Sequence, residues 1–303
     1  MDQRPALLAH CYRMLGSAHD AEDAVQETLL KAWRALPEYE GRSALGTWLY
    51  RIATNVCLDA IRRRPKRVLP VDYEDGAEWI EPFPDGDSAL EQGPAARYEQ
   101  REALELAFVA ALQHLPAQQR AVLILRDVLG FSSREVSAML ETSVASVNSA
   151  LQRARWGVEE RLPERSQQVA LRSLGDERVR ALVERFVEAF ERGDVEAILD
   201  LLAEDATFAM PPCPNWSRGR GAVAQSWLIP SEPGPPLRYM PTSANGQVSV
   251  GVYRLDESAG AYLPVCLDVL ALDEDGITEV VAFRAVQDLS RFRLPDKLPV
   301  DAA

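Results

Sequence analysis

The stretch with the clearest chemical character runs from residue 45 to residue 67. Arg51 and Asn55 share one side of a helix at 100° per residue, together with Thr47, Thr54 and Arg62. The stretch ends in five basic side chains within six residues, namely Arg62, Arg63, Arg64, Lys66 and Arg67. Such a strip suits a phosphate backbone. A basic last turn also complements the helix dipole, but this explains only about two or three of the charges.

Other chemistries find little support in the composition. Only three histidines occur, which argues against a histidine-based catalytic or metal site, so neither a cofactor nor a metal is predicted. The cysteines are far apart in sequence, form no C-x-x-C pair and are interpreted as reduced structural thiols of a cytoplasmic protein. They are Cys11, Cys57, Cys213 and Cys266. The sequence has no signal peptide and no apolar run of transmembrane length, so no membrane partner is expected.

A helix predicted for residues 20–36 precedes the basic stretch. Its apolar and small side chains recur at i, i+3, i+4 and i+7 and predict one buried stripe. The stripe consists of Ala21, Ala24, Val25, Thr28, Leu29, Ala32, Trp33 and Leu36. Asp20 is the expected N-cap, with Asp23 three residues further on. The outward face carries Asp23, Gln26, Glu27 and Lys31 and is either a solvated surface or a binding surface.

The basic strip itself belongs to a second helix, predicted for residues 45–64. Its expected buried stripe consists of Leu45, Trp48, Leu49, Ile52, Val56, Cys57 and Ile61. In the loop between the two helices, Tyr39 lies beside Arg42 and Ser43. An aromatic ring with a nearby cation can hold an unstacked base, although a single tyrosine is also often a packing residue.

These residues carry a resemblance to a known family. The blocks D-A-E-D-A-V-Q-E-T-L-L-K-A-W and G-R-S-A-L-G-T-W-L-Y-R-I-A-T-N resemble region 2 of bacterial sigma-70-family factors of the extracytoplasmic-function (ECF) group. The resemblance implies that the first helix binds the β′ subunit of core RNA polymerase through Asp20, Asp23, Gln26, Glu27 and Lys31. It also implies that the loop and second helix melt and read the −10 promoter element. The candidate DNA-binding residues are Tyr39, Arg42, Ser43, Trp48, Arg51, Asn55, Arg62 and Arg63.

Charge is distributed unevenly along the chain. The formal net charge of −13 argues against a nucleic-acid partner, but residues 1–70 carry +3, residues 71–96 carry −8 and residues 169–303 carry −8. Residues 69–96 are rich in proline and acid and are predicted to be a linker. Within it, Trp79, Ile80 and Phe83 suggest a segment that docks on another surface. The resemblance implies that this linker threads the polymerase, and a solvated spacer is the alternative.

The next part of the chain, residues 97–165, is predicted to be all helical. A helix capped by Ser132 or Ser133 and another over residues 144–162 form a helix-turn-helix. L-P-A-Q-Q-R-A-V-L-I-L-R-D-V-L-G-F and S-V-A-S-V-N-S-A-L-Q-R-A-R resemble sigma region 4, which implies binding to the −35 element. The candidate contacts are Ser143, Ser146, Asn148, Ser149, Gln152, Arg153 and Arg155. Many family members carry basic residues where this chain has Asn148 and Ala150.

After a polar connector at residues 163–175, the pattern changes to α+β. Two helices before residue 203 and strands at 206–210, 247–255, 261–272 and 277–287 predict an antiparallel meander. The pattern F-x-x-A-F-x-x-G-D, then L-L-x-x-D-A-T-F, then W-x-x-G resembles the cone-shaped SnoaL-like fold of the nuclear transport factor 2-like superfamily. This resemblance covers residues 176–290 and leaves 291–303 as a tail.

An enzymatic role for this last domain needs a buried general acid or base. The candidates are Asp268, which lies either inside the cone or on its outer face, and Asp205, but the domain contains no histidine. Because no catalytic set is evident, the expectation is a binding or regulatory domain. Its candidate pocket or interface residues are Phe208, Met210, Trp216, Trp227 and Tyr239.

The sequence as a whole predicts a multidomain protein with region 2 at residues 1–68, region 4 at 97–165 and an α+β cone. The resemblance implies a sigma factor that binds the β′ and β subunits of core polymerase and directs initiation at promoter DNA. The acidic cone is predicted to contact region 2 or region 4 and to regulate them in cis. The alternative is an enzyme that binds or converts a small molecule, with an accessory helical DNA-binding part.

Overall fold

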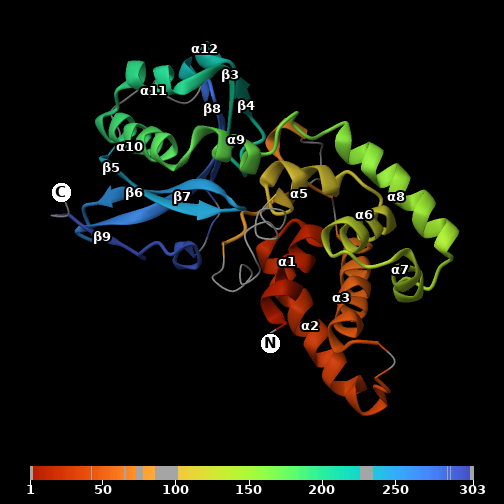
Figure 1. Cartoon of the computed structure of the whole chain (residues 1–303). Helices are drawn as coiled ribbons and strands as arrows, with labels where there is room; N and C mark the ends of the chain where they lie inside the picture. The colour runs from red at the N-terminus through yellow and green to blue at the C-terminus, as the bar shows by residue number, and fades with distance from the viewer. Residues whose placement is uncertain are drawn as a thin grey trace. The chain divides into compact units, whose positions relative to one another are not determined.

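The computed structural model describes residues 3–41, 43–64, 66–72, 78–85, 102–225, 235–284, 286 and 288–300 (Figure 1). The chain forms two compact units. The N-terminal unit contains Met1–Val68 and Glu74–Glu164, and the C-terminal unit contains Leu69–Tyr73 and Arg165–Ala303. The predictions for Arg42 and Trp227 concern residues outside the described part of the chain.

The N-terminal unit begins with three helices that pack against one another. They are α1 (Arg4–Leu15), α2 (Ala18–Ala35) and α3 (Leu45–Ile61). Gly16 ends α1 in the left-handed region at φ 70°, where a side chain would be strained. The expected cap at Asp20 is wrong, because α2 starts earlier and the Ser17 hydroxyl accepts the bond from the Asp20 amide.

The buried stripes of α2 and α3 are shorter than predicted. Thr28 and Ala32 are buried as expected, but the last turns of α2 project beyond the helices that cover its first half. Four side chains expected in the core are therefore exposed. The exposed fractions are 41% for Leu29, 75% for Trp33, 49% for Leu36 and 48% for Leu45.

Part of the predicted linker docks on the first three helices. Strand β1 (Arg67–Val68) pairs in parallel with β2 (Glu78–Trp79), and the Phe83 ring stacks on Tyr12 at a centroid distance of 4.5 Å. Ile80 is 1% exposed. The apolar residues of this segment therefore bury against the N-terminal unit, which supports the docking prediction over a solvated spacer for the described part.

The second helical part of this unit contains the predicted helix-turn-helix. Its elements are α5 (Leu106–Gln113), α6 (Ala117–Leu123), the π-helical turn η3 (Ile124–Val128), α7 (Ser133–Met139) and α8 (Val144–Glu159). Ser132 and Glu135 form a capping box at the start of α7, and Ser143 caps α8. The turn between α7 and α8 passes through Glu141 at φ 52° and ends at the Ser143 cap.

Buried polar side chains join the two helical parts of the N-terminal unit. Arg13 on α1 is 3% exposed and donates to the carbonyl of Ala103 at 2.9 Å. Arg120 on α6 is 5% exposed and donates to the carbonyl of Met14. Gln113 on α5 donates to the carbonyl of Arg13 at 3.2 Å. Each bond satisfies a backbone oxygen that packing hides from water.

The C-terminal unit begins with a helix where a connector was expected. α9 (Gln167–Leu174) is capped by Ser166, and Gln167 exchanges two hydrogen bonds with the backbone of Leu272. The connector prediction was wrong because the polar side chains of this segment bond the sheet instead of water. α10 (Asp176–Arg192) and α11 (Val195–Leu201) then follow as predicted, with Asp194 capping α11.

A mixed sheet forms the rest of this unit, in the order β4-β3-β8-β7-β6-β5 with β9 paired to β7. Its strands are β3 (Leu202–Ala209), β4 (Trp216–Arg218), β5 (Leu237–Ala244), β6 (Gln247–Asp256), β7 (Ala261–Asp273), β8 (Gly276–Phe283) and β9 (Leu298–Pro299). The meander β5 to β8 is antiparallel, whereas β3 joins β8 in parallel. The short helix α12 (Arg220–Val223) follows β4.

The predicted strands are present, and two further features were not predicted. β5 was missed because Pro241 interrupts its pattern, and it is an edge strand, where proline is tolerated. The expected tail contains β9 and buried Phe292 and Leu294. Gly276 begins β8 at φ 121°, and a Cβ there would lie 2.5 Å from the Leu201 carbonyl oxygen.

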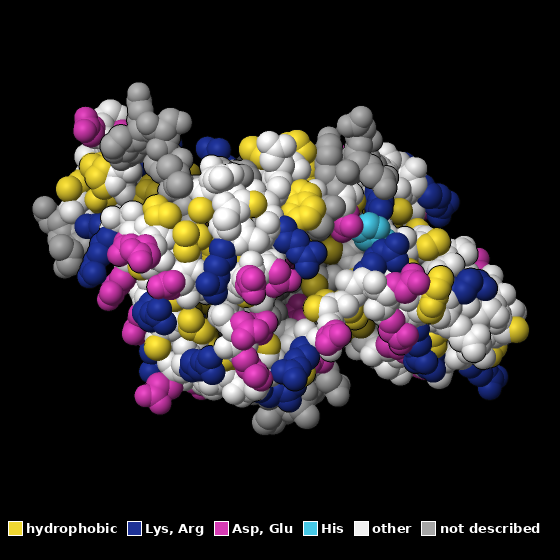
Figure 2. All heavy atoms as spheres, turned by 90° about the horizontal axis from the view of Figure 1, so that it is seen from above, with side chains coloured by type: hydrophobic (Ala, Val, Ile, Leu, Met, Phe, Trp, Pro, Cys, Tyr) yellow, Lys and Arg dark blue, Asp and Glu magenta, His cyan; other side chains and the backbone are white. Residues whose placement is uncertain are grey.

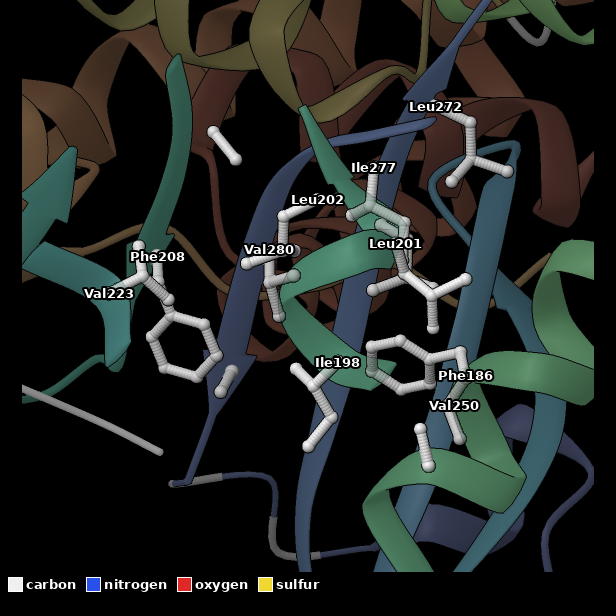
Figure 3. Packing of buried hydrophobic residues seen from close by; sticks show 14 of the residues in the cluster. Phe186, Ile198, Leu201, Leu202, Phe208, Val223, Val250, Leu272, Ile277 and Val280 are labelled. Carbon is white, nitrogen blue, oxygen red and sulfur yellow. The ribbon is translucent and has the colours of Figure 1, made fainter. Parts of the chain in front are cut away.

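The core of the C-terminal unit lies between its helices and one face of the sheet. α10 and α11 lie across that face in Figure 1. Figure 3 shows Phe186 and Ile198 directed from these helices toward Val250 and Val280 on the strands. Burial of such side chains, at about 1.5–3 kcal/mol each, drives the packing of helices on sheet.

Candidate polymerase- and DNA-binding surfaces

The outward face of α2 carries the predicted polar set, with one exception. Asp23, Gln26, Glu27 and Lys31 are exposed, and Glu27 pairs with Lys31 at 2.7 Å. Asp20 does not belong to this face, because its side chain is only 7% exposed and accepts bonds from Arg64 and Arg67. Its position near the start of α2 turns it toward the end of α3 instead of solvent.

An exposed apolar patch adjoins the polar face of α2. Trp33 is 75% exposed and Leu30 is 57% exposed, and Leu29 and Leu36 complete the patch. Sequence reasoning placed most of these residues in the core. The sequence signal for the patch was Leu30, a large apolar residue that lies outside the predicted buried stripe. Large exposed apolar side chains gathered on one helix mark a contact surface.

The loop after α2 brings two predicted DNA-binding aromatics together. The rings of Tyr39 and Trp48 lie 4.9 Å apart, and the Tyr39 hydroxyl donates to the Ser43 carbonyl. Trp48 is half-buried, so it both packs and borders the surface. This pair provides an aromatic face of the kind on which an unstacked base can lie.

On α3, the polar strip is present but smaller than predicted. Arg51, Asn55, Arg62 and Arg63 are exposed. Arg51 pairs with Glu141 in the helix-turn-helix at 3.3 Å, and Arg62 pairs with Asp59 at 2.9 Å. Thr54 was expected outward and is fully buried, because its hydroxyl donates to the Tyr50 carbonyl and lies 3.0 Å from the His10 ring.

Arg67, at the end of the basic run, is held by acidic side chains. Its guanidinium contacts Asp20 and Glu78 at 2.9 Å and Glu81 at 3.8 Å, and it donates to the Trp79 carbonyl at 2.7 Å. Its side chain is 13% exposed. The arginine therefore fastens the linker to α2. The signal for this contact in the sequence is weak and consists of the acids near Trp79, Glu78 and Glu81.

The helix-turn-helix exposes every predicted residue of its reading face. Ser143 and Ser146 bond each other at 2.9 Å at the start of α8, and Asn148 accepts from Ser133 at 2.8 Å. Arg155 is fixed by Asp127 through two bonds of 2.8 Å. The other members, Ser149, Gln152 and Arg153, are also exposed. Arg153 is thus the cation of this face that forms no ion pair with a carboxylate among the described residues.

In the C-terminal unit, the four candidate pocket residues that the structure describes do not form one group. Phe208 and Tyr239 are buried in the core, and Met210 packs against it. Trp216 is 39% exposed on β4 and does not join them. The Tyr239 ring lies 5.4 Å from Phe190 and 6.2 Å from Phe186, so it is part of an aromatic cluster beneath α10.

Asp268 lies inside the C-terminal unit, which decides between the two positions left open by the sequence. It is 5% exposed on β7, between Val250 on β6 and Ala282 on β8. Its carboxyl accepts a bond from the Cys266 thiol at 3.3 Å and has no salt-bridge partner among the described residues. Burial raises its pKa to about 7. Asp205 is instead an exposed residue paired with Arg218 at 3.0 Å.

Charged groups elsewhere, in the part of the chain that the structure describes, bear on whether a metal site or a single-sign surface is present. The described residues contain no group of three His, Cys, Asp or Glu side chains placed to hold a metal ion. On the face drawn in Figure 2, acidic and basic side chains intermingle. Of the helices that the structure describes, none has both the length and the apolarity to cross a bilayer.

The fold and its surfaces define a class of protein, namely a multidomain DNA-binding protein with a helix-turn-helix and a helix-covered sheet. Family models match the chain in the same order. Sigma-70 region 2 matches residues 1–67, Sigma-70 region 4 matches 105–156, and the SnoaL-like domain matches 183–254.

Similar proteins identify the family to which the chain belongs within this class. The chain is 40% identical over 312 residues to the ECF RNA polymerase sigma factor SigG of Mycobacterium tuberculosis, covering 97% of this chain and 82% of that protein. It is 29% identical to SigW of Bacillus subtilis over 50% of this chain and 80% of that protein. The chain therefore belongs to the ECF group of RNA polymerase sigma factors, which confirms the resemblance.

A solved structure shares the whole architecture. The Mycobacterium tuberculosis ECF sigma factor SigJ superposes with a TM-score of 0.62 and 20% identity, covering 96% of this chain and 97% of that one. At this identity the likeness concerns the fold, and it confirms helical sigma domains followed by an α+β domain. Both curated relatives named above are ECF RNA polymerase sigma factors.

Proposed function

We propose that this sigma factor binds core RNA polymerase through the outward side of α2 and recognises promoter DNA through two surfaces. The first consists of the Tyr39–Trp48 pair with Arg51, Asn55, Arg62 and Arg63, and it reads the −10 element. The second is the start of α8, and it reads the −35 element. One observation carries the proposal. The same chain contains an exposed helix-turn-helix and the helix α2, whose surface bears an exposed apolar patch and acidic side chains.

The C-terminal unit is proposed to regulate initiation in cis without catalysing a reaction. It is fused to the sigma regions and, with the linker, carries most of the acidic excess, whereas residues 1–70 carry +3. An electrostatic contact of this kind weakens with salt, since exposed charges are screened beyond about 10 Å at 0.1 M. Because the chain serves RNA polymerase, we place its action in the cytoplasm.

Transcription in vitro with purified core polymerase tests both parts. The full chain and a truncation lacking residues 165–303 are compared on a library of upstream sequences across salt concentrations. We expect promoter-dependent transcripts from at least the truncated form and a change in their level on truncation. Absence of any transcript contradicts the sigma assignment of these surfaces. Identical transcription by both forms contradicts regulation in cis.

The rival function is conversion of a small molecule by the C-terminal unit. The buried carboxyl of Asp268 is the single observation that favours it. Turnover of a polyketide-like substrate by the full chain, abolished by Asp268→Asn, supports this rival and contradicts a purely regulatory unit.

Trp33→Ala is expected to weaken binding to core polymerase by about 30-fold or more. An aromatic anchor that becomes buried at an interface commonly contributes 2 kcal/mol or more. Trp216→Ala is the matched control, because it removes an exposed tryptophan from the C-terminal unit. Affinity for core polymerase is measured with fluorescently labelled protein. Equal affinities of Trp33→Ala and wild type remove the apolar patch from the docking surface.

The double variant Asp23→Ala with Glu27→Ala should also weaken core binding, by a smaller factor. Both carboxylates are exposed, and rim charges mainly change the association rate and its salt dependence. We expect the association rate to fall about 3- to 10-fold at low salt, with little change in dissociation. The control pair is Glu159→Ala with Glu160→Ala on the far end of α8. Unchanged association kinetics exclude the polar face of α2 from polymerase docking.

Arg153→Ala should lower affinity for −35 duplex DNA and reduce the slope of log K against log salt by about one unit. The reason is that one phosphate contact releases about one counterion. Arg161→Ala, an exposed cation beyond the reading face, is the control and should leave the slope unchanged. Fluorescence anisotropy of the truncated and full chains between 50 and roughly 200 mM salt measures the slope. An unaltered slope for Arg153→Ala removes this side chain from the phosphate contacts.

A further inference from the structure

A cleft of about 450 Å³ lies at the junction between the two helical parts of the N-terminal unit. One wall is apolar and consists of Leu15, Ile61, Leu115 and Pro116. The rest is polar and consists of Asp20, Arg64, Lys66, Arg67, Gln113, His114 and Arg120. Its size is that of a site for a small organic ligand, which typically measures about 300–1,000 Å³.

The cleft has an excess of positive charge. Four cationic side chains line it against the single carboxylate of Asp20. That carboxylate is already shared by Arg64 and Arg67. The Lys66 ammonium lies 3.0 Å from Nδ1 of His114, and no carboxylate among the described residues lies within ion-pair distance of it. The ammonium donates to this nitrogen with one of its three N–H groups, so an anion in the cleft can accept bonds from the others.

We propose that this cleft binds a phosphorylated anion of nucleotide size, which extends the chain's role beyond recruitment of polymerase and promoter. The phosphates lie against Lys66 and Arg64, the two exposed cations of the lining, because phosphate accepts several charge-assisted hydrogen bonds. The base and sugar lie against the apolar wall of Leu115, Pro116 and Ile61. A free phosphate chain uses only the first of these two parts.

Binding at this place favours the packed arrangement of the two helical parts. Arg64 and Lys66 follow α3, whereas His114 and Pro116 lie between α5 and α6. A ligand that touches both sides is bound fully only when they are in contact. By mass action it therefore stabilises that contact, and the gain increases with ligand concentration.

Isothermal titration of the full chain with GTP, pyrophosphate and guanosine at low salt tests the proposal. We expect GTP to bind more tightly than pyrophosphate and guanosine to show no heat of binding. Lys66→Gln should weaken GTP binding at least tenfold, whereas Lys66→Arg should retain it. Arg134→Gln is the control, since it removes an exposed cation on α7 that does not line the cleft, and it should change affinity less than twofold.

Three results would overturn the proposal. One is the absence of GTP and pyrophosphate binding in the wild-type chain. A second is an equal loss in Lys66→Gln and Arg134→Gln, which indicates unspecific attraction to exposed cations. The third is a GTP affinity of Lys66→Gln equal to that of the wild type, which removes this side chain from the site. Circular dichroism of each variant confirms that the substitution at an exposed side chain leaves the fold intact.

Discussion

Replacing Arg120 by alanine should lower the free energy of unfolding of the N-terminal unit by about 3–5 kcal/mol. The guanidinium is buried and donates to the backbone oxygens of Gln113, Leu115 and Met14 and to the side-chain oxygen of Gln113. Burial lowers its pKa to about 10, so it stays protonated at neutral pH. Without it, these oxygens lose a charged donor in a place that water does not reach. Each hydrogen bond to a charged group contributes about 1.5–3 kcal/mol.

Urea unfolding of the full chain, followed by circular dichroism, measures this loss. Arg120→Lys keeps the charge but offers three donors on one atom, so an intermediate loss is expected. Arg134→Ala, an exposed arginine on α7, is the control and should change stability by less than about 0.5 kcal/mol. A loss below about 1 kcal/mol for Arg120→Ala would show that the two helical parts are held together by other contacts.

Asp268→Asn should make the C-terminal unit more stable at pH 8, and the gain should disappear near pH 4. The pKa of this carboxyl is raised to about 7 by burial, from the ordinary 3.8. The folded chain therefore keeps a proton that the unfolded chain has lost above pH 4. Stability falls as pH rises from about 4 to 7, and the difference between these pKa values corresponds to roughly 4 kcal/mol. An asparagine does not ionise and escapes this penalty.

Part of that gain is lost, because a buried amide needs more hydrogen-bond partners than a protonated carboxyl does, and it lacks them here. We therefore expect a net gain of about 1–3 kcal/mol at pH 8. Asp205→Asn, on the exposed face of β3, should change stability by less than about 1 kcal/mol at either pH. Thermal unfolding at pH 4, 6 and 8 measures all three chains. A pH-independent difference between Asp268→Asn and wild type contradicts a raised pKa.

Local signals in the sequence predicted most elements of the fold. Gly193 and Asp194 placed the boundary between α10 and α11, and Ser132 placed the start of α7, because capping depends on residues only a few positions apart. The order of the domains followed from the two sigma-like blocks and the later change to strand periodicity.

Errors arose where distant partners decide the outcome. The period of α2 continues to Leu36, but burial stops where the neighbouring helices end, and no local pattern marks that point. Asp20 was included among the polymerase-binding residues because its two arginine partners lie 44 and 47 positions away and leave no local signal. The segment containing α9 was read as a connector because Gln167 bonds a strand 105 positions further along.

The exposure of the candidate DNA-binding residues was predicted better than the burial of the residues that hold the surfaces in place. Arg51, Asn55, Arg153 and the cap Ser143 are exposed on helices, where residue type and helical phase suffice for a prediction. The buried Arg13 and Arg120 have the same residue type as surface cations, and only the folded chain distinguishes them.

The parallel pairing of β3 with β8 has a consequence for how the protein is made. Thr207 on β3 and Glu279 on β8 are paired and lie 72 positions apart. At a synthesis rate of about 5–20 residues per second, β3 waits roughly 4–14 s for its partner strand. The helical segments up to Glu164 leave the ribosome well before this, and helical parts fold fast because their contacts are mostly local. Each newly made molecule therefore passes through a period in which its promoter-reading helices are folded and its C-terminal sheet is still incomplete.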